Sequence, residues 1–272
     1  MKIPNSRRNL DLAIERKFGR GNSYMRARTA MANVVVGQLL PGGAVKGGSA
    51  IKLRFGEEVT RFTTDLDVAR ATGLDEYVAD LEDALDEGWC GFSGTVVPRR
   101  PAHPKDVPDQ YVMRPYDIKL SYNGTPWCTV PLEVGHDEIG DADEPDWGLP
   151  DDVRQIFLDL GFPEPRRVPL MPLHHQVAQK LHAVTAPGGE RAHDLIDLQV
   201  IVSMGELDFP LTRATCERLF AYRGMQQWPP EVAQGLGWEK RYDDQRAGVD
   251  VLPTVTEAVE WANDLVRRIA RA

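Results

Sequence analysis

Two short motifs in the first quarter of the chain contain residue types that bind a nucleoside triphosphate and its metal ion. The first is Gly47-Gly48-Ser49, and the second, sixteen residues after the serine, is Asp65-Leu66-Asp67. Side chains two apart in a β-strand point to the same face, so Asp65 and Asp67 would project together. Adjacent carboxylates repel each other unless a cation lies between them, and such oxygen ligands suit Mg²⁺. The second motif therefore predicts a metal site, although an exposed acidic strand end would have the same sequence.

The glycine-rich motif predicts the phosphate-binding part of the same site. Glycines let the backbone approach a phosphate closely, and Gly48 and Ser49 at the start of a helical turn can offer N–H groups and a hydroxyl to an anion. Lys52 and Arg54 follow at helical spacing and could bring charge to the β- and γ-phosphates. The glycine spacing matches neither a Walker loop nor a dinucleotide fingerprint. A capped helix after a tight turn is the alternative interpretation.

One or two metal ions can activate the attacking hydroxyl and neutralise the leaving pyrophosphate. A two-metal site generally needs a third carboxylate from a neighbouring strand. Glu133 is the first candidate for this ligand. Asp117 and Asp137 are the alternatives, and each of the three acids is equally compatible with an ordinary surface position.

The second half of the chain adds a lysine and several charged neighbours. Lys180 stands beside the apolar face of a predicted helix and could neutralise a triphosphate, and Asp194 could orient this lysine or act as a base. Arg191 lies three residues before Asp194, and Asp197 follows one helical turn later. A salt bridge between two helices is the structural alternative. Neither a Ser-His-Asp hydrolase nor a Cys/His zinc site is indicated.

Hydrophobic periodicity predicts the elements that position these residues. In the first half it predicts helices over 5–18, 23–40 and 73–87, with a helical turn over 50–55. Strands are predicted over 62–69, 91–97, 111–122 and 126–134. Asn123-Gly124 is typical of a hairpin, and Pro131 indicates an edge strand. In the second half, helices are predicted over 151–160, 172–185, 190–203, 212–222 and 254–271.

These elements predict two domains joined by an acidic linker over 137–150. Residues 1–145 would form a mixed α/β domain with N-terminal helices, and residues 146–272 a helical domain that completes the active site. Hydrophobic residues make up 42% and charged residues 27% of the chain, as in ordinary soluble proteins. No apolar run reaches about 18 residues, so we expect no membrane span. Three widely spaced cysteines suggest no disulfide framework, and we expect a cytoplasmic protein.

Charge is distributed unevenly along the chain. The net charge of −9 argues against general nucleic-acid binding. Residues 1–30, however, contain eight bases and two acids, a net +6, so the remainder is at −15. A basic segment on an acidic body can contact phosphates locally, and a solvated helix face is the alternative.

Four segments, taken in order, resemble the AbiEii-type nucleotidyltransferase toxins, a group that includes the mycobacterial MenT toxins. They resemble the family's Gly-Ser-x₄-Arg, Arg-Phe-Ser/Thr-x-Asp-x-Asp, Ala-x-Lys-Leu/Phe-x-Ala and Arg-x-Lys-Asp-hydrophobic-x-Asp-Leu motifs. In this chain they begin at Gly48, Arg61, Ala178 and Arg191. His193 departs from the pattern, because the family usually has lysine at this place.

The resemblance implies an α+β protein: a polymerase-β-like nucleotidyltransferase fold, with a mixed sheet and an appended C-terminal helical domain. By position it implies that Ser49 binds phosphate, that Asp65 and Asp67 bind the metal, that Lys180 contacts the triphosphate and that Asp194 is a catalytic acid. Lys52 and Arg54 are both candidates for the basic residue of the first motif.

The resemblance also implies a function. Family members pair with a cognate antitoxin in type IV toxin–antitoxin or phage-defence systems, and some transfer nucleotides to the 3′ end of tRNA. We therefore expect a Mg²⁺-dependent toxin that transfers NMP from an NTP to an RNA acceptor, the tRNA 3′ end, and so inhibits translation. The +6 segment would suit an RNA acceptor stem. The alternatives are a nucleotidyltransferase with a small-molecule or protein acceptor, and a non-catalytic NTP- or antitoxin-binding module.

Overall fold

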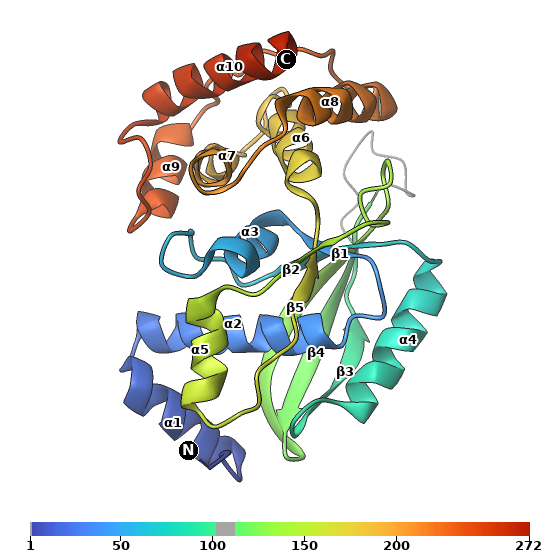
Figure 1. Ribbon diagram of the computed structural model, residues 1–272, viewed down its shortest axis with the longest axis vertical. Helices are drawn as coiled ribbons and strands as arrows, with labels where there is room; N and C mark the ends of the chain where they lie inside the picture. Colours follow the sequence, from blue (N-terminus) through green and yellow to red (C-terminus); the bar gives the residue numbers. More distant parts are fainter. Residues whose placement is uncertain (1, 102–111) are drawn as a thin grey trace. The chain divides into compact units, whose positions relative to one another are not determined.

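The computed structural model describes residues 2–101 and 112–272 (Figure 1). The chain divides into two compact units. The first contains the chain up to Glu57 together with Thr63–Asp137 and Ala142–Leu170, and the second contains Glu58–Phe62, Glu138–Asp141 and Met171–Ala272. Among the described residues, no helix combines the length and the apolar character that crossing a membrane requires.

The first unit is built on a seven-stranded mixed sheet with the strand order β3-β4-β5-β2-β1-β7-β6. Its strands are β1 (Ala44–Lys46), β2 (Leu66–Arg70), β3 (Phe92–Pro98), β4 (Arg114–Tyr122), β5 (Thr125–His136), β6 (Asp146–Gly148) and β7 (Val168–Leu170). The pairs β2–β5 and β1–β7 are parallel, and the other neighbours are antiparallel.

Successive residues of the strands point alternately to a hydrophobic face and a polar face of the sheet. Val45, Val68 and Val134 are aligned across β1, β2 and β5 and belong to the hydrophobic core. The helices of this unit also contribute side chains to the core: α1 (Arg7–Phe18), α2 (Asn22–Gln38), α3 (Gly47–Phe55), α4 (Leu74–Glu87) and α5 (Asp151–Asp159). Figure 1 shows α2 running across the sheet and α4 lying beside β3. Since successive residues of a strand point to opposite faces, Lys46, Asp67 and Glu133 lie on the face away from this core.

The second unit is helical. It contains α6 (Leu173–Val184), α7 (His193–Met204), α8 (Phe209–Arg223), α9 (Trp238–Arg246) and α10 (Val255–Arg271), with α6 packed between α7 and α8 (Figure 1). Two residues of the local sequence determine where α10 begins. Thr254 and Glu257 form a capping box, each side chain binding the backbone N–H of the other, which satisfies two N–H groups that the helix leaves open.

The structure confirms the predicted hairpin and corrects the position of its second strand. Asn123 and Gly124 have φ of 47° and 72° and join β4 to β5. The expectation that Pro131 marks an edge strand is wrong, since β5 lies inside the sheet. β2 pairs with β5 only from Leu132 onward, so at Pro131 the strand has β4 alone as its neighbour and the missing N–H breaks no bond to β2.

Three other elements differ from the sequence prediction. The helix that follows β1 begins at Gly47 rather than at residue 50. α9, which has little apolar periodicity, was not predicted. Residues 146–170 contribute β6, α5 and β7, and the strands β6 and β7 extend the sheet of the first unit.

Candidate active site

The centre of the candidate site is a row of three charged side chains across three neighbouring strands. Lys46 at the end of β1 is aligned with Asp67 on β2, and Asp67 is aligned with Glu133 on β5. Aligned residues of adjacent strands project to the same face with their Cβ atoms about 5 Å apart. The register therefore brings Asp67 and Glu133 together from distant parts of the sequence, on the polar face of the sheet.

Gly47 lets the Asp67 carboxylate approach the first residue of α3. Gly47 has φ of 67°, and a Cβ built on it would lie 2.2 Å from Oδ2 of Asp67. Any larger residue here would collide with the carboxylate. No side chain caps the first turn of α3, which begins at this glycine. Backbone N–H groups at such a helix start carry partial positive charge and suit an anion.

Asp65 lies just before β2, is exposed, and is oriented by two hydroxyl groups. The Thr63 hydroxyl donates to Oδ1 of Asp65, and the Ser49 hydroxyl donates to the Asp65 carbonyl oxygen. Nδ2 of Asn33 donates to the Ser49 oxygen at 3.5 Å. Ser49 is 1% exposed, so its hydroxyl here fixes the backbone that carries Asp65. Its predicted phosphate contact stays a prediction, and Gly48 and Ser49 supply backbone N–H groups in the first turn of α3.

The donor set suits Mg²⁺ together with a substrate. Within residues 2–101 and 112–272, no three His, Cys, Asp or Glu side chains are clustered closely enough to hold a metal ion. Mg²⁺ usually binds one or two carboxylates and takes its remaining ligands from water and substrate phosphates. Asp65 and Asp67, with Glu133 beside Asp67, are hard oxygen donors of this kind, so the residues present fit the ion.

The two alternatives to Glu133 lie further from Asp67 in register. Asp117 is aligned with Pro131, and its carboxylate binds Lys119 at 3.0 Å and Arg99 at 3.8 Å. Asp137 follows the end of β5. Of the three acids, Glu133 is the one aligned with Asp67, which favours it as the third ligand.

The Lys52 side chain is buried inside the first unit, where its ammonium is bound by residues of that unit. It is 0% exposed, and its ammonium lies 3.0 Å from Oε1 of Glu57 and donates to the Thr63 carbonyl at 3.0 Å. Arg54 binds the Asp146 carboxylate at 2.8 Å. These contacts join α3 to the segment that leads into β2 and to β6. The predicted triphosphate contact of Lys52 or Arg54 remains a prediction.

In the second unit, Lys180 belongs to a buried cluster of charges. Its ammonium lies 2.8 Å from Asp194 and 2.6 Å from Asp197, and these three residues are at most 5% exposed. Arg191 binds the other oxygen of Asp194 at 2.8 Å, and Arg61 binds both oxygens of Asp197 at 2.9 and 3.0 Å. The structure thus brings together Lys180, Asp194 and Arg191, with Asp194 bound to Lys180 as the sequence analysis expected.

The cluster keeps its members charged. Burial raises the pKa of Asp194, but Lys180 and Arg191 outweigh burial and hold this pKa below its ordinary value. Burial raises the pKa of Asp197, but Lys180 and Arg61 outweigh it and hold this pKa below its ordinary value. Burial lowers the pKa of Lys180, but the two aspartates outweigh it and hold this pKa above its ordinary value. Such an Asp194 is a weak base, so its geometry favours orienting Lys180 over accepting a proton.

His193 does not replace the lysine that the family usually has at this place. Burial, with Arg61 and Arg191, lowers the pKa of His193 to about 4 although Asp194 opposes this shift. The imidazole is therefore neutral at pH 7 and adds no positive charge beside Asp194.

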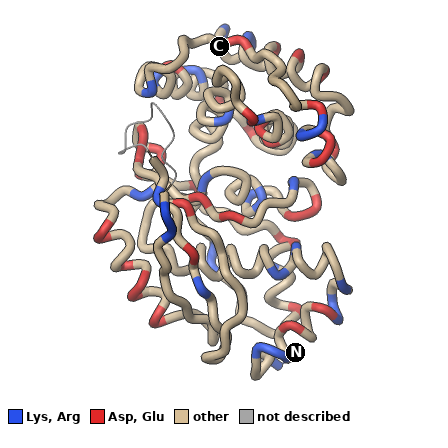
Figure 2. Tube along the Cα trace, turned by 180° about the vertical axis from the view of Figure 1, so that it is seen from behind, with Lys and Arg blue, Asp and Glu red and all other residues tan. Residues whose placement is uncertain are grey.

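The basic N-terminal segment is partly neutralised within the fold. Near the N-terminus, Figure 2 shows Lys and Arg positions alongside Asp and Glu positions. Two acids, Asp11 and Glu15, lie in α1, and α2 contains none. Five of the eight bases in residues 1–30 form ion pairs with described acids: Arg7, Lys17, Arg20, Arg26 and Arg28. The +6 segment is therefore a weaker argument for RNA binding than its sequence suggests.

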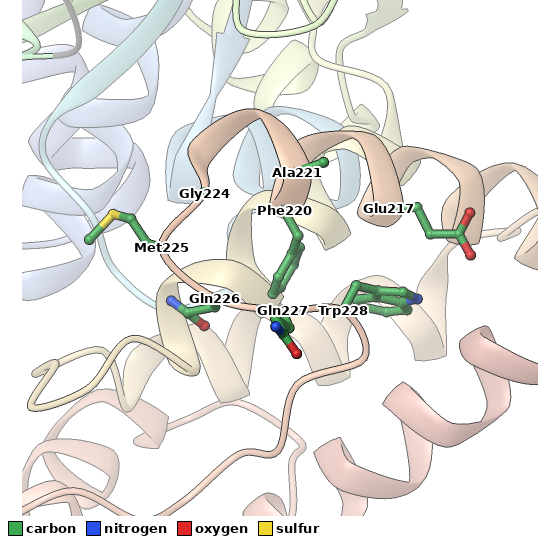
Figure 3. Close-up of a pocket in the computed structure, with 8 residues that line it drawn as sticks. All are labelled: Glu217, Phe220, Ala221, Gly224, Met225, Gln226, Gln227 and Trp228. Carbon is green, nitrogen blue, oxygen red and sulfur yellow. The ribbon is translucent and has the colours of Figure 1, made fainter.

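A hollow of about 770 Å³ lies elsewhere, at the C-terminal end of α8 (Figure 3). Phe220 and Trp228 line it with their ring centroids 5.3 Å apart, and the Gln226 amide donates to the His182 carbonyl at 3.1 Å. None of the residues that line it was predicted to act in the site, so the hollow is not part of the candidate site.

Sequence reasoning assigned no role to several residues that the structure places at the two centres. Lys46 and Thr63 lie beside the carboxylates of the first unit, and Arg61 and Asp197 complete the cluster of the second. Lys46 directly precedes the glycine pair, and Arg61 and Asp197 stand inside the quoted motifs, so position in the sequence was the available signal.

The match to the solved structure of MenT4 supports the fold. MenT4, a nucleotidyltransferase toxin from Mycobacterium tuberculosis, matches with 20% identity over 96% of this chain and 98% of that chain, at a TM-score of 0.52. JHP933 from Helicobacter pylori matches with 15% identity over 92% of this chain and 93% of that chain, at a TM-score of 0.43. No curated protein matches the chain.

Comparison with protein families is decisive. The sequence profile described as nucleotidyl transferase AbiEii toxin, type IV TA system, matches residues 31–264, which is most of the chain. The predicted family and the predicted α+β nucleotidyltransferase fold are confirmed. The chain therefore belongs to the AbiEii family of type IV toxin–antitoxin systems, and it is a nucleotidyltransferase.

Proposed function

We propose that this toxin is Mg²⁺-dependent and transfers NMP from an NTP to the 3′ hydroxyl of an RNA, the tRNA 3′ end, thereby inhibiting translation. The observation that carries the proposal is the register of Asp67 with Glu133 beside the uncapped start of α3. These carboxylates would supply metal ligands next to a helix terminus that suits a phosphate, on one face of the sheet.

The residues of the first unit have distinct roles in this reaction. Asp65, Asp67 and Glu133 would hold Mg²⁺, and the N–H groups of Gly48 and Ser49 would bind phosphate oxygens. When bound, the metal would favour deprotonation of the attacking hydroxyl and neutralise charge on the leaving group. A bond forms between the acceptor oxygen and the α-phosphorus, and the bond to the pyrophosphate breaks. Thr63 and Ser49 orient Asp65 for this task.

Lys180 keeps its predicted role as a triphosphate contact. Support comes from its charge, since Asp194 and Asp197 hold the ammonium in its protonated form and in one position. Arg191, half-exposed and bound to Asp194, is a second cation of the same cluster. Asp194 would act chiefly by orienting Lys180, and a role as catalytic acid or base is the alternative.

The acceptor and the partners follow from the family. Its description names toxins of type IV toxin–antitoxin systems, so we propose an NTP substrate, a cognate antitoxin and a cytoplasmic site of action, with a role in phage defence. The tRNA acceptor rests on the family resemblance stated above, because some members modify the tRNA 3′ end.

Transfer of label tests the proposal directly. Purified protein is incubated with each labelled NTP, Mg²⁺ and total tRNA, with total RNA lacking tRNA as a parallel substrate. We expect label in tRNA, its loss on chelation of the metal, and its loss in Asp65→Ala and Asp67→Ala. Asp80→Ala, which removes an exposed acid of α4, is the matched control and should label normally.

The outcomes separate the parts of the proposal. Label in another RNA alone would move the acceptor away from tRNA. Absence of transfer to any RNA, or transfer unchanged in Asp65→Ala, would overturn the proposed reaction.

A further inference from the structure

Lys46 is a buried lysine with no anionic partner among the residues that the structure describes. It is 9% exposed, and within this part of the chain its ammonium has neither a hydrogen bond nor a carboxylate oxygen within 4.0 Å. Burial of an uncompensated charge is costly, and proteins normally pair such groups. The Lys46 ammonium keeps some exposure to solvent, so it is accessible to an anion that binds from outside the chain.

The ammonium lies on the same face as the candidate metal ligands. Lys46 is aligned with Asp67, which is aligned with Glu133. Its side chain reaches across β2 to β5, where Nζ lies 2.8 Å and Cε 3.5 Å from the position of a Cβ on Gly135. Gly135 stands two residues after Glu133 and thus on the same face. The absence of a side chain at Gly135 makes the space that the ammonium occupies.

A second positive feature begins at the next residue. Lys46 occupies the N-cap position of α3 in an extended conformation, and no side chain caps the first turn. The open N–H groups of this nine-residue helix and the Lys46 ammonium therefore adjoin the two carboxylates. Such a combination matches a metal–phosphate ligand, in which the cation meets the carboxylates and the phosphate oxygens meet the positive groups.

We infer that the Lys46 ammonium, which lies in the space that Gly135 leaves open, binds a non-bridging phosphate oxygen of the NTP. This inference rests on the proposed function and adds a substrate-binding residue to it. A purely structural Lys46, which only moderates the repulsion between Asp67 and Glu133, would affect stability without affecting NTP affinity.

Binding of a non-hydrolysable NTP analogue in Mg²⁺, measured by calorimetry without any RNA, tests the inference. Lys46→Met should weaken binding by about 10- to 100-fold, the range for a lost hydrogen bond between charged groups. Lys46→Arg should recover part of the affinity. Lys119→Met is the matched control, because Lys119 is an exposed lysine of β4 bound to Asp117, and its affinity should equal that of the native chain.

Gly135→Ala provides a test that leaves the lysine in place. The new methyl group would collide with Nζ of Lys46, at the flexible end of that side chain, and would meet the Val68 carbonyl oxygen at an ordinary contact distance of 3.5 Å. The fold should therefore persist while the ammonium is displaced. We expect weakened NTP binding in Gly135→Ala, and no further weakening when Gly135→Ala is added to Lys46→Met. Thermal unfolding of each variant checks that the fold is retained.

The results distinguish this inference from the function on which it rests. If the native chain binds the analogue and Lys46→Met binds it equally well, the inference is overturned and the nucleotidyltransferase proposal stands. If additive losses appear in the double variant, the two residues do not share one contact, and the inference is again overturned. If no NTP binds to the native chain, both fail.

Discussion

Arg61 donates two hydrogen bonds to Asp197, from Nε at 2.9 Å and from Nη2 at 3.0 Å, so that one guanidinium covers both carboxylate oxygens. Lys180 binds the same carboxylate at 2.6 Å. One buried carboxylate therefore binds two cations. Asp197 is as important to the cluster as Lys180 and Asp194.

Removal of Asp197 should destabilise the protein strongly. In Asp197→Ala, Lys180 and Arg61 lose a buried counter-charge, and loss of one partner from a buried ion pair costs about 3–5 kcal/mol. Urea unfolding measures the effect. Asp243→Ala removes an exposed aspartate that pairs with Arg246 on α9 and should change stability by less than about 0.5 kcal/mol. Equal unfolding midpoints for both variants would contradict the structural role of the cluster.

The third metal ligand can be identified by comparing two conservative variants. Glu133→Gln should lower the transfer rate by at least about 10- to 100-fold, since removing even an outer partner of a metal ligand has this effect. Asp117→Asn should remain close to native, because Asp117 is aligned with Pro131 and is bound by Lys119. Initial rates at saturating NTP over a range of Mg²⁺ concentrations provide the measurement. A larger loss in Asp117→Asn would reverse the assignment.

Lys52 should prove to be mainly a stabilising residue. Lys52→Met leaves the buried Glu57 with Arg26 as its remaining ion-pair partner in this unit, and we expect a loss of roughly 3 kcal/mol in unfolding free energy. Lys17→Met, which breaks a more exposed pair with Asp159, should cost at most about 1 kcal/mol. Should Lys52→Met unfold like the native chain but bind NTP weakly, the phosphate contact predicted from the sequence would be correct instead.

Stability should fall between pH 7 and pH 5 because of His182. Arg223 Nη1 lies 3.1 Å from Nδ1 of His182, and since a guanidinium only donates, this nitrogen accepts and the ring is neutral. Burial and the Arg223 charge lower the pKa of His182 to about 4, against the opposing charge of Glu138.

The sign of the effect follows from this lowered pKa. The unfolded chain, with an ordinary histidine pKa of about 6.5, binds more protons than the folded chain as the pH falls from about 6.5 toward 4. Stability from this group is therefore complete above about pH 6.5 and is lost below it. His182→Gln should lose less stability between pH 7 and pH 5 in urea unfolding. An identical decrease in both proteins would show that His182 does not cause it.

Local sequence signals predicted most helices and strands, but they could not predict which strands pair over long distances in the sequence. Asn123-Gly124 predicts a hairpin because the turn chemistry lies in two adjacent residues. Pro131 misled the interpretation because whether a strand is at an edge depends on β2, which pairs with β5 from far away in the sequence. α9 was missed because its burial rests on Trp238 and Tyr242 rather than on a repeated apolar face.

The same distinction applies to the candidate site. Asp65 and Asp67 could be chosen from their spacing, but the alignment of Glu133 with Asp67 depends on sheet register, which no single segment encodes. Lys46 was visible beside the glycine pair, yet its significance comes from Gly135, which leaves space for the ammonium on another strand. Lys52 appeared suited to phosphate because helical spacing does not reveal that Glu57 would bury it.

The parallel pairing of β2 with β5 has a consequence for the cell that makes this toxin. During translation, Asp67 is synthesised before β3, β4 and β5, and a parallel strand cannot pair with its neighbour until the whole connection exists. A nascent or prematurely terminated chain that stops before Glu133 lacks the end of β5, which pairs with β2, and one that stops before α6 lacks Lys180. Because the proposed site draws on Asp67, Glu133 and Lys180, we expect incomplete products of the gene that end before α6 to be inactive.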